Sequence, residues 1–138
     1  MKILALDMGD VWTGTAISDP TGTFARPYQT VKTKELEQFL AEKIEAENIE
    51  QIVVGHAKTL KGTESEQTKK IKTRAEELGL KFPTVSWVLW DERLTSKMAA
   101  KGRKRKTAKD KLQSHSIAAA FILDSYLIYL QNNKKMQG

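Results

Sequence analysis

Side chains that can bind a metal ion or transfer a proton occur at three places in the sequence. Asp7 ends the apolar run 3–6, and Asp91 and Glu92 follow the apolar run 85–90. His115 lies near the start of the final predicted helix, on its apolar stripe. Carboxylates and imidazoles are ligands of divalent cations and the usual groups of acid–base catalysis. These residues could act together only if the fold brings the three places close to one another.

Two of these places follow segments that are predicted to be strands. In open α/β sheets, ligands bind beyond the carboxyl ends of the strands. Carboxylates that converge there repel one another unless a cation lies between them. Oxygen ligands favour Mg²⁺ or Mn²⁺. The sequence thus predicts a divalent-metal site at one end of a sheet.

Each candidate also has a structural interpretation. An aspartate after a strand commonly serves a turn, as Asp7 could, and residues 91–93 could be a surface ion-pair cluster. His115, on an apolar stripe, could be a hydrogen-bonded core residue, and His56 is predicted to be a solvated loop residue. The conjunction at one end of one sheet favours function for Asp7, Glu92 and His115.

The first third of the chain predicts an antiparallel meander. Residues 2–7 indicate a buried strand, residues 15–18 a second one, and residues 25–31 a third. Gly9 and Gly14 flank the first predicted turn, and Asp19-Pro20-Thr21-Gly22 is a strong turn signal before the third strand. Pro27 favours an edge position for that strand, because proline cannot donate a ladder hydrogen bond.

The remainder predicts strands that alternate with helices. Apolar residues at helical spacing after a Thr33 N-cap precede the strand 49–54. A capping box at Thr63 and Glu66 opens a second helix, which Gly79 is expected to end before the strand 85–90. This order requires parallel strands joined by crossovers. The final helix is expected over residues 108–130, with one stripe formed by Leu112, His115, Ala119, Ile122 and Tyr126.

Length and composition bound the remaining possibilities. The 138 residues correspond to one domain, with 131–138 expected as a flexible polar tail. The absence of cysteine excludes disulfides, zinc thiolate sites and thiol nucleophiles. No secretory signal or bilayer-spanning run is visible, so we expect a cytoplasmic protein.

The net charge of +6 is concentrated in one segment. Residues 97–111 carry eight basic side chains and one acid, whereas the rest of the chain sums to −1. A localised basic segment on a near-neutral body favours nucleic acid as partner, and a solvated loop is the alternative. The expected phosphate contacts are made by Lys101, Arg103, Lys104, Arg105 and Lys106.

Four motifs, in order over residues 1–127, resemble the YqgF/RuvX family. They are Leu6-Asp7-Met8-Gly9 with Gly14-Thr15-Ala16-Ile17-Ser18-Asp19-Pro20, then Ile52-Val53-Val54-Gly55, then Asp91-Glu92-Arg93-Leu94-Thr95-Ser96, and finally Ile117-Ala118-Ala119-Ala120-Phe121-Ile122-Leu123. The resemblance implies an α/β RNase H-like fold. That fold has a mixed five-stranded sheet, an antiparallel meander followed by two parallel strands, with helices on both faces.

The resemblance also implies a function. It suggests a nuclease that processes the precursor of the small-subunit ribosomal RNA, related to Holliday-junction resolvases. The family's acids match Asp7 and Glu92. A third acid usually stands where this chain has His115, and a basic residue where it has Trp12. Histidine can still bind a divalent metal, and Trp12 could either pack or stack on a nucleobase.

The resulting hypothesis is two-metal hydrolysis of a phosphodiester bond with Mg²⁺ or Mn²⁺. Asp7 is expected to bridge the ions, with Glu92 and His115 each holding one and Asp91 as a further candidate. Arg93 could bind phosphate or position a carboxylate. The alternatives are a resolvase-like DNA nuclease and a catalytically weakened nucleic-acid-binding module. A sugar kinase or actin-like ATPase, whose phosphate loop the first motif also resembles, would need a second lobe. RNA against DNA, endonuclease against exonuclease action and oligomeric state stay open.

Overall fold

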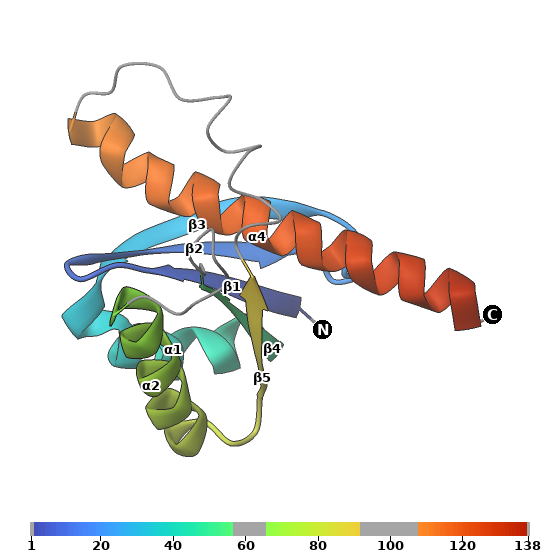
Figure 1. The fold of residues 1–138 in the computed structure, drawn as a ribbon, viewed down its shortest axis with the longest axis horizontal. Coiled ribbons are helices and arrows are strands. Elements are labelled where there is room, and N and C mark those ends of the chain that lie inside the picture. Colours follow the sequence, from blue (N-terminus) through green and yellow to red (C-terminus); the bar gives the residue numbers. More distant parts are fainter. Residues whose placement is uncertain (1, 57–65, 92–107, 138) are drawn as a thin grey trace.

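The computed structural model describes residues 2–56, 66–91 and 108–137 (Figure 1). The described elements form one sheet and the helices that cover it. In chain order they are β1 (Lys2–Met8), β2 (Trp12–Ser18), β3 (Ala25–Lys32), the 3₁₀ turn η1 (Thr33–Glu35), α1 (Leu36–Ala46), β4 (Ile49–His56), α2 (Glu66–Lys81), β5 (Ser86–Asp91) and α4 (Ala108–Gln137).

The five strands form a mixed sheet in the order β3-β2-β1-β4-β5. β1 and β3 both run antiparallel to β2, whereas β4 runs parallel to β1 and β5 parallel to β4. The predicted meander and parallel pairs are therefore confirmed. Pro27 lies on β3 at one edge of the sheet, as its missing N–H requires.

Helices cover both faces of the sheet (Figure 1). α4 packs on β1, β2 and β3, while α1 and α2 lie against the opposite face. Strand alternation divides β1 between two cores. Ile3 and Ala5 face the α4-side core, which includes Leu123. Leu4 and Leu6 face the core under α1 and α2.

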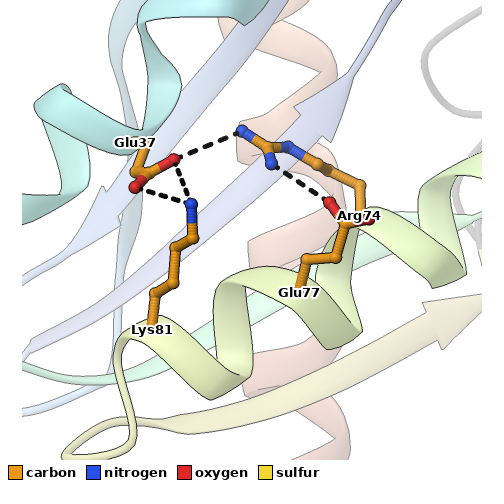
Figure 2. A network of polar contacts seen from close by, with 4 residues as sticks. All are labelled: Glu37, Arg74, Glu77 and Lys81. Carbon is orange, nitrogen blue, oxygen red and sulfur yellow. Dashed lines mark hydrogen bonds and ion pairs between the residues drawn. The ribbon is translucent and has the colours of Figure 1, made fainter.

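Charged side chains join α1 to α2 at the surface (Figure 2). Lys81 donates to both carboxylate oxygens of Glu37 at 2.9 Å. The guanidinium of Arg74 lies 3.9 Å from Glu37 and donates to Glu77 at 3.2 Å. The hydrogen bond from Lys81 is the main cause that lowers the pKa of Glu37. The network links the two helices at the surface.

Two predicted helix boundaries are wrong. Thr33 does not cap α1, because its hydroxyl donates to the Gly9 carbonyl at 2.7 Å and η1 intervenes. Gly79 does not end α2, which continues to Lys81, and an added Cβ at Gly79 would lie 3.6 Å from Trp87. Gly79 therefore lies within the helix, beside the Trp87 ring. Thr63 of the expected capping box lies outside the described residues.

The final helix begins at Ala108 as predicted but ends later. α4 continues to Gln137, so residues 131–137 extend the helix beyond its expected end at residue 130. None of the helices in the described part of the chain has the length and apolar composition needed to cross a membrane.

Candidate active site

Asp7 lies near the carboxyl end of β1 and on the α4 side of the sheet. Its neighbours Ile3 and Ala5, at the same strand parity, belong to the α4-side core. The side chain retains 24% of its exposure, so Asp7 stands where the buried strand reaches solvent. A carboxylate in that position is accessible to a ligand at the rim of the sheet.

His115 on α4 lies opposite this carboxylate. Its Nδ1 atom is 4.0 Å from Oδ2 of Asp7, and its side chain is 36% exposed. That distance exceeds the range of a hydrogen bond, so the two side chains face one another without a hydrogen bond between them. Two of the predicted site residues, 108 positions apart in sequence, are thus brought to one place on the molecule.

Gly14 allows this approach, a role that the sequence pattern did not indicate. Rather than flanking a turn, Gly14 lies within β2 as the register partner of Asp7. A Cβ at Gly14 would stand 2.0 Å from the carbonyl oxygen of His115 and 2.6 Å from the Ser116 nitrogen. The α4 backbone therefore rests directly on this strand. A glycine within a strand is the signal for such an approach.

Asp91 and His56 lie on the opposite face from Asp7. The two residues are register partners on β5 and β4. His56 shares the parity of Ile52 and Val54 in the core under α1 and α2, and Asp91 alternates with Trp90 of the other core. The sheet therefore separates Asp91 from the Asp7 side chain. The expectation that His56 is a solvated loop residue is wrong, because it is in β4 and 7% exposed.

Trp12 begins β2 and is half-buried. Its carbonyl accepts a hydrogen bond from the Gly9 N–H at 2.9 Å, which closes the β1–β2 turn. The other predicted binding residues, Arg93, Lys101, Arg103, Lys104, Arg105 and Lys106, lie outside the described residues, as does Glu92.

The donors at this place suit a divalent metal ion. Asp7 offers carboxylate oxygens and His115 an imidazole nitrogen, on different elements and both accessible to solvent. Within residues 2–56, 66–91 and 108–137, no group of three metal-binding side chains occurs. The described part thus provides two ligands of a set that needs at least one more, and Glu92 is the third predicted one.

The sequence of the chain is similar to that of a known protein family. The family profile described as "RuvX: Holliday junction resolvase" matches residues 1–129. The chain belongs to the RuvX family. A relative from Rubrobacter xylanophilus, named "Putative pre-16S rRNA nuclease", is 40% identical over 130 residues, which cover 91% of each chain. One of the same name from Carboxydothermus hydrogenoformans is 36% identical over 145 residues, covering 96% of this chain and all of that one.

Solved structures support the fold of this RuvX-family chain. Thermus thermophilus RuvC in complex with a Holliday junction substrate is similar with a TM-score of 0.60 at 13% identity, covering 95% of this chain and 96% of that one. A second structure of Thermus thermophilus RuvC gives a TM-score of 0.58. These likenesses, together with the sheet order, confirm the predicted RNase H-like fold.

Proposed function

We propose that this chain is a divalent-metal-dependent nuclease whose substrate is the precursor of the small-subunit ribosomal RNA. Membership of the RuvX family and the names of its relatives support hydrolysis of nucleic acid. The observation that carries the proposal is the 4.0 Å approach of His115 to Asp7 at the rim of the sheet. A ribosomal RNA precursor as substrate would place the protein in the cytoplasm.

Asp7, His115 and Glu92 would hold the metal ions, with Mg²⁺ or Mn²⁺ as the expected cation. The ions would supply charge stabilisation at the phosphate and a more acidic bound water. The protein's own contribution is to fix the ligands. Asp7 is held by a central, buried strand and His115 by a helix that rests on Gly14, so neither ligand must be ordered when substrate arrives.

The basic segment supplies the contact with the substrate backbone in this proposal. It joins β5 to α4 in sequence, so its two ends are tied to the elements that carry Asp91 and His115. Arg93, Lys101, Arg103, Lys104, Arg105 and Lys106 would bind phosphates, which orients a strand without reading its sequence. Trp12, at the start of β2, is a candidate for stacking on a base.

Branched DNA is the second candidate substrate. It is favoured by the family description "Holliday junction resolvase", whereas the relatives' names favour ribosomal RNA. His115 at the place where the family usually has an acid favours a third reading, a binding module with weak or no turnover. One assay separates the three.

The assay compares cleavage of end-labelled single-stranded RNA, duplex DNA and a four-way junction in Mn²⁺ and in EDTA. We expect the wild type to cut RNA only with Mn²⁺. Asp7→Asn should lower the rate by more than the roughly 10–100-fold that loss of an outer-shell partner costs. Preferred cutting of the junction would establish the second substrate instead. Binding without cutting, unaffected by Asp7→Asn, would leave the binding module.

A further inference from the structure

A small cavity of mixed polar and apolar lining lies beside the candidate active site, on the other face of the sheet. It begins at Met8, the residue after Asp7, and continues along the Gly9–Asp10 turn to Thr33. Its other wall is the first half of α2, with Gln67, Lys70, Ile71 and Arg74. All these residues lie in the described part of the chain.

The size of the cavity limits what it can bind. Its volume is about 140 Å³. Pockets that hold a whole nucleoside or a drug-sized ligand measure roughly 300–1,000 Å³. A single tetrahedral anion such as a phosphate group fits the smaller space, whereas a base with its sugar does not.

Lys70 is the cation that this cavity offers to a ligand. Arg74 already lies against Glu37 and donates to Glu77, so nearby carboxylates balance its charge (Figure 2). Among the described residues, no carboxylate lies within ion-pair distance of Lys70. Asp10 is the acid of the lining, and its side chain is exposed to solvent, which screens its repulsion of an anion.

Two side chains of the α2 wall, Gln67 and Lys70, can donate hydrogen bonds to an anion. Gln67 and Lys70 stand one turn apart on α2, at the end of the helix where its partial positive charge lies. Thr33 instead uses its hydroxyl to clamp the turn through the Gly9 carbonyl. The clamped turn and the helix therefore fix the backbone of the wall, from which the exposed side chains of Gln67 and Lys70 offer an amide donor and an ammonium group.

We propose that this cavity, between the Gly9–Asp10 turn and the Gln67–Lys70 turn of α2, binds a backbone phosphate of the nucleic-acid strand that is cut at Asp7. This inference rests on the proposed function. Asp7 and Met8 are consecutive and point to opposite faces of β1, so a strand that crosses the rim can contact both sides. The subsite would hold the strand beside the scissile bond without reading its bases.

The test measures binding of a single-stranded RNA of about 12 nucleotides in EDTA, from about 50 to 200 mM salt, so that no metal ion contributes. Lys70→Ala should weaken binding roughly five- to tenfold and reduce the salt slope by about 0.7. Lys69→Ala is the matched control. It removes the same charge from the same helix, but Lys69 pairs with Glu66 and does not line the cavity. We expect it to change affinity less than about twofold.

A second readout follows the cavity directly. The Gly9 and Asp10 backbone amides and the Gln67 side-chain amide should shift in NMR spectra when the RNA is added to wild type, and not with Lys70→Ala. Equal effects of Lys69→Ala and Lys70→Ala, unshifted amides, or no RNA binding by the wild type would each overturn the proposal. If the wild type cleaves RNA but Lys70→Ala binds it as well as the wild type does, the subsite is refuted and the nuclease proposal stands. Binding that depends on Lys70 without any cleavage would refute the nuclease and leave the subsite.

Discussion

Asp7 and His115 form a contact whose geometry depends on what each residue is attached to. Asp7 stands on a strand buried between two others, and His115 stands on a helix that covers that strand. Because both backbones are fixed by packing, the fold brings the two side chains to one place, where Nδ1 of His115 lies 4.0 Å from Oδ2 of Asp7. A cation that binds there loses little binding free energy to the ordering of its ligands.

Asp19 is a residue whose charge state is coupled to the folding of a turn. Its Oδ1 accepts the N–H groups of Thr23 and Phe24 at 2.8 Å, and Thr21 donates its hydroxyl to Oδ2. These bonds, that to Phe24 first, lower the pKa of Asp19 from 3.8 to about 2. Gly22, at φ +69°, completes the turn that joins β2 to β3.

This lowered pKa predicts how one variant responds to pH. The ionised Asp19 stabilises the folded turn at any pH above 3.8, and this contribution is lost as the pH falls from 3.8 to about 2. The melting temperature of Asp19→Ala should therefore lie below that of the wild type at pH 6, and the gap should shrink towards pH 2. Thermal unfolding followed by circular dichroism checks this. A gap that is the same at pH 6 and pH 2 would contradict the account.

Among the elements, α4 connects the stability of the fold to the candidate site. Its middle buries Ile122 and Leu123 in the α4-side core, and its first half carries His115 over Gly14. The helix can rest so closely on β2 only where the strand lacks a side chain. Docking of one helix thus determines where His115 stands relative to Asp7.

Gly14→Ala is predicted to disturb this docking. The new Cβ would overlap the backbone of His115 and Ser116, neither of which can turn aside. Overpacking of this kind typically costs about 1–3 kcal/mol and occasionally more. Urea unfolding should register the loss.

Gly79→Ala is the matched control for that substitution. Its Cβ would make an ordinary contact with Trp87 at 3.6 Å, inside a helix where alanine is preferred over glycine. We expect it to raise the free energy of unfolding by about 0.5–1 kcal/mol. Equal effects of the two substitutions would refute the close packing of α4 on β2.

The elements themselves could largely be predicted from the sequence, because apolar periodicity and turn residues are local signals. The parallel direction of β1, β4 and β5 followed from the rule that strand–helix–strand units are parallel. Thr33 and His56 could not be placed this way. The Thr33 hydroxyl is used by the Gly9 turn, and β4 continues through Gly55 to His56 instead of ending at the glycine. Both outcomes depend on tertiary contacts that local patterns do not contain.

Across the whole molecule, the sheet divides the predicted site residues. Sequence alone placed Asp7, Asp91 and His115 at one rim, since the ends of parallel strands meet there. It did not resolve the faces, because that requires the register of β5 against β4. In the structure, Asp7 and His115 share the α4 side, and Asp91 belongs to the other side with His56. The cavity with Lys70 lies on that other side too.

Mn²⁺ binding shows whether Asp7 and His115 form one metal site. Free Mn²⁺ is measured by electron paramagnetic resonance as protein is added, for the wild type, Asp7→Asn, His115→Ala and Asp91→Asn. We predict that each of the first two substitutions weakens binding by at least about tenfold. Asp91→Asn, on the opposite face, should leave it unchanged. Mn²⁺ binding that survives Asp7→Asn and His115→Ala but is lost in Asp91→Asn would contradict the account.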